Sequence, residues 1–168
     1  MSIREKNIRS YFRKRIIVDT GPLILLLAGY YNYDTIGKNK LTEEFTKDDF
    51  DILTGFLSNF RGIIVTPHVL TEVSNLINTK VNKDDFTDFI ERIIEKLSSF
   101  KEVYIQKDEI LAGEEVKKVG ITDAGILLAS EKRDNLILTK DFKFENLCIS
   151  KGLPVIHFDK LREESWFG

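Results

Sequence analysis

The chain has 168 residues, of which 42% are hydrophobic and 31% are charged, and its net charge is −2. This composition predicts a folded globular protein with a sizeable core, and it excludes a disordered chain and a nucleic-acid binder that relies on overall basicity. The single cysteine, Cys148, excludes an internal disulfide and a cysteine-based zinc site.

The ends of the chain and its apolar runs bear on location and domain organisation. The N-terminus lacks the apolar stretch of a signal peptide, and the longest apolar run, Pro22–Gly29, is too short to span a bilayer. We therefore expect a cytoplasmic protein with no membrane contact. No repeat or Pro/Gly-rich linker divides the sequence, which predicts a single domain over 1–168 with a basic N-terminal extension at 1–14.

Short β-branched runs alternate with helical patterns along the chain. The first half is expected to contain a strand at Arg15–Asp19, a helix at Pro22–Tyr31 with Pro22 first, a polar surface excursion at Asn32–Lys47, a helix at Thr46–Phe60 capped by Thr46, a strand at Gly62–Thr66 and a helix at Pro67–Thr79. The second half is expected to contain a helix at Lys83–Phe100, a strand at Glu102–Gln106, helices at Asp108–Lys118 and Thr122–Arg133 joined near Gly120, a strand at Asn135–Thr139, a helix at Phe142–Ser150 and a strand at Pro154–His157. The order predicts an α/β protein, with three α/β/α layers around a parallel central sheet.

Four acidic residues fall where separate segments of this fold would meet. Asp19 and Asp141 follow predicted strands, and ligands of parallel sheets bind beyond the carboxyl ends of the strands. Glu72 and Asp123 lie on predicted helices. Gathering carboxylates is costly unless a cation is present, and oxygen-only ligands favour Mg²⁺ or Mn²⁺. Metal-assisted phosphodiester chemistry is therefore the leading hypothesis.

Each acid alone also has an ordinary structural explanation. Asp19 suits a helix cap, Glu72 a solvated helix face, Asp123 the first turn of a helix capped by Thr122, and Asp141 a turn. Thr20 and Thr139 are minor candidates for the same site. His157 is expected to be a packed histidine and Cys148 a small core residue.

Taken together and in their order along the chain, the motifs favour a functional site over separate structural roles for these acids. The stretches VDTGPLILLLAG, TPHVLTEVSNLI, ITDAGILLAS and LTKDF resemble the PIN-domain nucleases, which include VapC-type toxins of toxin–antitoxin pairs. The resemblance runs from about Arg15 to Phe158. It implies a PIN-like fold and divalent-metal-dependent hydrolysis of single-stranded RNA to products with 5′-phosphate and 3′-hydroxyl ends. An antitoxin partner and a homodimer are compatible with it. The family's ordered acids correspond to Asp19, Glu72, Asp123 and Asp141.

Roles follow from this correspondence. Asp19 and Asp123 are expected to be the principal metal ligands, Glu72 to position a water or a second ion, and Asp141 to bind directly or through water. Asp159, which also follows an apolar run, is expected to cap the last helix instead. The cations expected to hold RNA are Arg133, Lys140, Lys143 and the N-terminal cluster of Arg4, Lys6, Arg9, Arg13, Lys14 and Arg15.

Two rival functions remain open. A non-catalytic PIN-fold module that binds RNA or protein would keep the fold and lose the metal. A phosphatase-like or receiver-like enzyme would use a strand-end Asp as nucleophile or phosphoacceptor. The best-known phosphatase pattern needs a second Asp two residues on, where this chain has Gly21, and receivers need adjacent acids after the first strand, which are missing beside Ile16–Val18.

Overall fold

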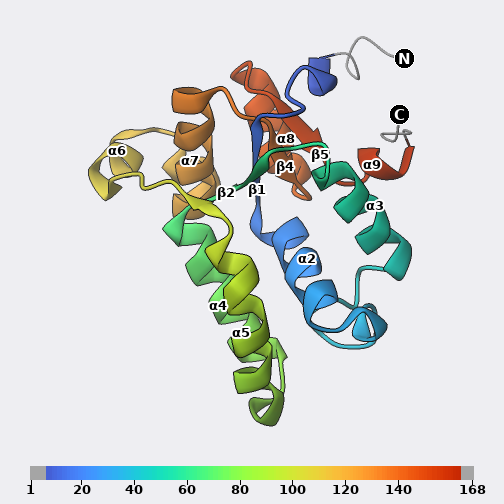
Figure 1. Cartoon of the computed structure of the whole chain (residues 1–168). Coiled ribbons are helices and arrows are strands. Elements are labelled where there is room, and N and C mark those ends of the chain that lie inside the picture. The colour runs from blue at the N-terminus through green and yellow to red at the C-terminus, as the bar shows by residue number, and fades with distance from the viewer. Residues whose placement is uncertain (1–6, 164–168) are drawn as a thin grey trace.

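A five-stranded sheet forms the centre of the computed structural model, which describes residues 7–163 (Figure 1). The strand order is β3-β2-β1-β4-β5, and all four pairings are parallel. The fold is therefore α/β with a parallel central sheet, as the sequence predicts. The strands are β1 (Arg15–Val18), β2 (Gly62–Val65), β3 (Lys101–Glu102), β4 (Ile137–Thr139) and β5 (Val155–His157).

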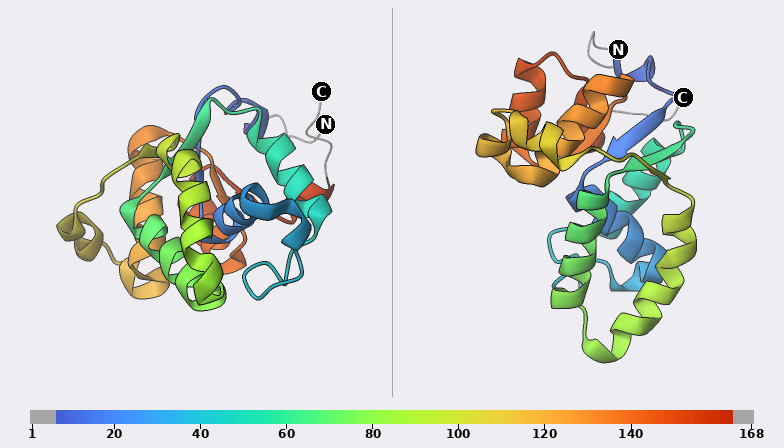
Figure 2. Two further views of the ribbon diagram at one scale, coloured as in Figure 1. Left: turned by 60° about the horizontal axis from the view of Figure 1, so that its bottom comes forward. Right: turned by 90° about the vertical axis from the view of Figure 1, so that its left-hand side faces the viewer.

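Helices flank this sheet on both sides. In Figure 1, α6 and α7 lie to its left and α3 and α9 to its right, while α4 and α5 form a helical hairpin that extends below it (see also Figure 2). The helices are α2 (Thr20–Asn32), α3 (Lys47–Leu57), α4 (Pro67–Lys80), α5 (Lys83–Ser98), α6 (Lys107–Ala112), α7 (Val116–Arg133), α8 (Phe142–Ser150) and α9 (Lys160–Glu163), with a 3₁₀ turn, η1, at Tyr33–Thr35.

Helix α2 is the central helix of the core. All of its residues from Pro22 to Gly29 are buried. A helix that is apolar on every side needs partners on every side, and α2 packs against α3, α4 and α5. Its start differs from the prediction, because Asp19 is the N-cap and Pro22 is the third helical residue. Proline is tolerated there because N–H groups of the first turn have no partner within the helix.

The segment between α2 and α3 is not the polar surface excursion that its composition suggests. Ile36, Leu41 and Phe45 are buried in the core, and Thr42 is fully buried. The predicted cap of the following helix is confirmed: Thr46 and Asp49 form a reciprocal capping box at the start of α3.

The region after α5 contains the largest differences from the prediction. Strand β3 is limited to Lys101–Glu102, because the chain leaves the sheet soon after the Val103 N–H binds Val65 O at 2.9 Å. Helix α6 is short. Helix α7 (Val116–Arg133) consists of two helical stretches that meet at Gly120, where the backbone is not helical (φ 86°, ψ 179°). The predicted junction near Gly120 is thus confirmed, and Thr122 lies in the first turn beyond it, whereas the first stretch begins at Val116 and is separate from α6.

The described part of the N-terminal segment packs on the fold. Ile8 is buried, and Tyr11 and Phe12 contact the hydrophobic core. Residues 7–14 are therefore not a loose extension, whereas the predicted cations Arg4 and Lys6 lie outside the described residues. Within 7–163, no helix combines the length and apolarity needed to cross a membrane.

The close approach of α2 and α3 yields a stability prediction. A Cβ added at Gly29 would overlap the ring of Phe50, whereas a Cβ at Gly125 in α7 would make only ordinary contacts of 3.5 and 3.6 Å. Gly29→Ala should lower the free energy of unfolding by about 1–3 kcal/mol, the usual cost of overpacking. Gly125→Ala is the matched helical control and should be neutral or stabilising. Urea unfolding of both variants measures this, and equal effects would contradict the packing described here.

Candidate functional site

Asp19 is a buried carboxylate held at both oxygens. It follows β1 directly and its residue is only 8% exposed. The Thr20 N–H donates to Oδ1 at 2.7 Å, which caps α2, and the Thr139 hydroxyl donates to Oδ2 at 2.6 Å. Because Thr139 ends β4, the neighbour of β1, this second bond ties two strand ends together. The side chain is therefore fixed at the carboxyl edge of the sheet.

Glu72 reaches the same edge from α4. Its Oε2 accepts a hydrogen bond of 3.1 Å from the Thr20 hydroxyl, which joins α4 to the start of α2. Glu72 is exposed, and this bond leaves its other carboxylate oxygen open. The two explanations given for Glu72 are therefore compatible: the solvated face of α4 that carries it also borders the candidate site.

Asp141 lies on the other side of Asp19. Its N–H donates to the Thr139 hydroxyl at 3.0 Å, and its Oδ1 accepts from the Phe144 N–H at 3.0 Å, which caps α8. A continuous chain of hydrogen bonds therefore runs from Glu72 through Thr20, Asp19 and Thr139 to Asp141.

Asp123 completes the group from the first turn of α7 beyond the kink. It is half-buried and its pKa is raised to about 7, first by burial and then by the charges of Asp19, Asp141 and Glu72; the charge of Lys143 opposes this rise. The pKa of Asp19 is also raised, mainly by burial, although its two hydrogen bonds counteract this and the charges of Glu72 and Asp141 add to it. The charges of Glu72 and Asp141 therefore reach both Asp19 and Asp123, which places the four predicted acids in one group.

The donor set suits a hard divalent cation, because it consists of carboxylates and hydroxyls. A cation would also offset the repulsion that adds to the effect of burial in raising the pKa of Asp19 and Asp123. In the conformation that the structure describes, no three His, Cys, Asp or Glu side chains of residues 7–163 lie close enough together to hold a metal. Binding would therefore require a shift of side chains, for which Glu72 and Asp141 have room because both are exposed.

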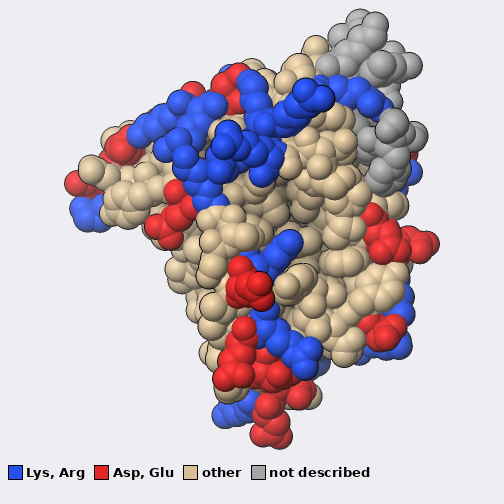
Figure 3. All heavy atoms as spheres, viewed as in Figure 1, with Lys and Arg blue, Asp and Glu red and all other residues tan. Residues whose placement is uncertain are grey.

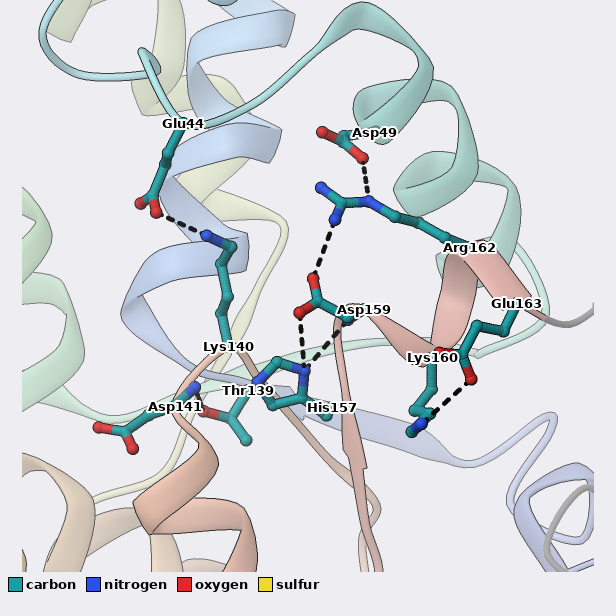
Figure 4. A network of polar contacts seen from close by, with 10 residues as sticks. All are labelled: Glu44, Asp49, Thr139, Lys140, Asp141, His157, Asp159, Lys160, Arg162 and Glu163. Atoms are coloured by element: carbon teal, nitrogen blue, oxygen red, sulfur yellow. Dashed lines mark hydrogen bonds and ion pairs between the residues drawn. The ribbon is translucent and has the colours of Figure 1, made fainter.

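Two lysines of the predicted cation set flank these acids. Lys140 Nζ binds Glu44 Oε2 at 2.5 Å and points away from Asp141 (Figure 4), and Lys143 Nζ donates to Lys118 O at 2.9 Å. Glu44 was not among the predicted residues, and its sequence context in the Asn32–Lys47 segment gives no signal for this contact. Four other predicted cations, Arg13, Lys14, Arg15 and Arg133, lie near the starts of the strands and thus at the opposite edge of the sheet.

Asp159 belongs to a different polar network (Figure 4). Its Oδ1 accepts from Arg162 at 3.1 Å, Arg162 also binds Asp49 at 2.7 Å, and the Asp159 N–H donates to His157 Nδ1 at 3.2 Å. His157 is buried and stacks on Phe142 with ring centroids 3.7 Å apart, as expected of a packed histidine. Asp159 immediately precedes α9, so it is engaged at the helix start and not among the acids.

The surface beside Asp19 and Asp141 is a shallow hollow of about 380 Å³, bordered by Gly21, Lys140 and Phe142. A larger hollow of about 810 Å³ lies between the Asn32–Lys47 segment and the turn from α4 to α5, away from the acids. The smaller hollow is the candidate site, because Asp19 and Asp141 line it. An open surface of this kind suits a polymer better than an enclosed small molecule.

Comparison with known proteins identifies relatives by fold only. No protein-family model matches the chain, and no curated protein matches it. The crystal structure of PAE2754 from Pyrobaculum aerophilum is similar, with a TM-score of 0.55 and 15% identity over 92% of this chain and 99% of that chain. A domain of a functionally unknown protein from Methanocaldococcus jannaschii matches with a TM-score of 0.45 and 20% identity over 86% of this chain and 90% of that one. The first match supports the α/β/α architecture over nearly the whole chain.

The raised pKa of Asp123 predicts how stability depends on pH. Because the pKa of Asp123 is about 7 in the folded protein and near its ordinary value of 3.8 in the unfolded chain, the folded state binds more protons between these values. The metal-free protein should therefore lose stability as pH rises through this window. Asp123→Asn should reduce that loss and make the protein more stable near pH 8, by on the order of 1 kcal/mol. Unfolding in EDTA at pH 5 and pH 8 measures this, and an unchanged pH dependence in the variant would contradict it.

Proposed function

We propose that the chain is a divalent-metal-dependent endoribonuclease of the PIN-domain type, which hydrolyses phosphodiester bonds of single-stranded RNA. The observation that carries the proposal is the convergence of four carboxylates at the carboxyl edge of a parallel sheet. Hydrogen bonds through Thr20 and Thr139 link Glu72, Asp19 and Asp141, and the charges of these three acids act on Asp123. A structural role explains each acid separately, but it does not explain why a fold should gather four of them. A toxin role with an antitoxin partner, a homodimer and a cytoplasmic location remain expectations.

The proposed cofactor is Mg²⁺ or Mn²⁺, held by Asp19 and Asp123 with Glu72 and Asp141 completing the set. When bound, such a cation lowers the pKa of a coordinated water and offsets negative charge on the phosphoryl oxygens. The residues of the chain supply orientation. Asp19 is held at both oxygens by Thr20 and Thr139, so its carboxylate has a fixed orientation around which the other acids would move to complete the set.

Glu72 is suited to manage the attacking water. Its carboxylate is positioned by the Thr20 hydroxyl at 3.1 Å and is otherwise exposed, so it can accept a hydrogen bond from water and orient it toward phosphorus. The RNA backbone would approach through the shallow hollow beside Lys140 and Phe142. Lys143, whose charge acts on Asp123, would offset repulsion between the acids and the phosphates. Lys140 would do so after releasing Glu44.

The pair Asp141 and Asp159 tests the proposal. Asp141→Asn should reduce cleavage of a fluorescent single-stranded RNA in Mn²⁺ by at least about tenfold, which corresponds to roughly 1.4 kcal/mol of transition-state stabilisation. Asp159→Asn is the matched control, since it also follows a strand but binds Arg162 and His157, and it should retain activity within about twofold. Initial rates on an RNA panel measure both.

Two controls exclude a contaminating nuclease. EDTA should abolish cleavage, and Asp19→Asn should be folded and inactive. If folded wild type and Asp19→Asn cut equally, the activity does not come from this chain. If neither cuts any RNA in millimolar Mn²⁺ or Mg²⁺, the non-catalytic binding module becomes the better account.

A further inference from the structure

The starts of the strands carry a charge opposite to that of their ends. Arg15 begins β1, Arg61 directly precedes β2, Lys101 begins β3 and Arg133 ends α7 just before β4. The register aligns Arg15 with Gly62 and Ile64 with Lys101. Because all strands run parallel, these side chains are gathered at one edge of the sheet, opposite the edge that holds the acids. A four-residue strand such as β1 separates the two edges by about 13 Å.

This edge is hollowed. A cavity of about 500 Å³, called here the basic hollow, has nine lining residues, seven of which are Lys or Arg; the other two are Ile64 and Asn135. Figure 3 shows the basic side chains of this region as a continuous blue area on the upper part of the visible face, bordered by a few acidic side chains. The chain as a whole has a net charge of −2, so the hollow is a local excess of positive charge and not a sign of general basicity.

Most of these cations have no acidic partner. Lys14 pairs with Asp134 at 2.9 Å, and Lys132 pairs with Glu109. The other five basic residues of the hollow form no ion pair with the described part of the chain. The negative end of the α7 dipole favours Lys132 and Arg133, but it does not account for the cations that lie before β1, β2 and β3. Like charges gathered in this way repel unless an anion is bound among them.

The backbone holds the hollow rigid and bears strain to do so. The Arg13 N–H binds Asn59 O at 2.8 Å and the Arg61 N–H binds Lys14 O at 2.8 Å, which joins the segments that lead into β1 and β2. Arg13 has φ 69°, in the left-handed region where glycine is favoured. Residues other than glycine in this region cost on the order of 1 kcal/mol or more, and such strained positions cluster at binding and active sites.

We infer that the basic hollow is a binding site for the phosphate backbone of a polynucleotide, separate from the acidic site at the other edge of the sheet. Four of its seven cations are arginines, whose planar guanidinium groups bind phosphate oxygens in pairs. Backbone binding requires only cations, whereas a protein partner needs apolar anchors, and Ile64 is the one apolar lining residue. A nucleic acid held there also avoids the repulsion of the four acids. This inference does not depend on ribonuclease activity.

Binding without metal tests it independently of cleavage. Fluorescence anisotropy in EDTA would follow a labelled 20-nucleotide RNA and the full-length chain. The variant Arg15→Gln/Arg61→Gln/Arg133→Gln should weaken binding at least about tenfold and reduce the slope of log K against log salt by about 2, since each phosphate contact contributes about 0.7.

The matched control removes the same charge elsewhere. Lys38→Gln/Lys40→Gln/Lys80→Gln alters three exposed lysines of the larger hollow and should change affinity less than about twofold. Equal weakening by both triple variants, or none by the first, would overturn the inference. Polyglutamate that competes as well as RNA of equal charge would also overturn it, in favour of an acidic protein partner.

Arg13→Gly is a second test of the site, in which a loss of RNA affinity cannot be explained by misfolding. Glycine relieves the left-handed strain, so the melting temperature should rise while RNA affinity falls. A variant with a raised melting temperature and unchanged affinity would show that Arg13 does not contact the nucleic acid, which contradicts the proposed site.

Discussion

The structure depends on one buried carboxylate. Asp19 ends β1, caps α2 through the Thr20 N–H and accepts the Thr139 hydroxyl from β4. These two bonds connect the central strand, the central helix and the neighbouring strand at a single side chain. Burial nevertheless raises its pKa, since desolvation outweighs both bonds. The fold therefore keeps a costly group at its most constrained position, where a hydrophobic residue would pack without that cost.

Parallel strands give the molecule two chemically distinct edges. Residues before the strands gather at one edge, residues after them at the other, and the sheet holds the two apart. In this chain the first edge contains Arg15, Arg61 and Lys101, and the second contains Asp19 and Asp141. A net charge of −2 conceals this separation. A polyanion would be attracted to the first edge without metal, but it would be repelled by the second unless a cation neutralised the carboxylates.

Local patterns predicted most of the strands and helices, because β-branched runs and capping residues act within a few positions. Residues 142–150 form a helix as predicted, and Thr46 caps α3. The junction predicted near Gly120 is also present, because glycine readily adopts the positive φ found there. The prediction failed where tertiary contacts decide: Ile36 and Phe45 of the polar segment are buried. The hydrogen bond between Thr20 and Glu72 joins residues 52 positions apart, and the basic hollow requires the strand order. Neither follows from spacing along the chain.

The central claim is that the acids at the carboxyl edge bind a divalent cation. Electron paramagnetic resonance of free Mn²⁺, titrated with the purified protein, measures this binding directly and needs no substrate. The account predicts one or two Mn²⁺ sites with dissociation constants below about 1 mM, which corresponds to a binding free energy of about −4 kcal/mol or stronger. It also predicts that a folded Asp19→Asn variant loses these sites. Free Mn²⁺ that stays undiminished by millimolar wild-type protein, or equal binding by the variant, would contradict it.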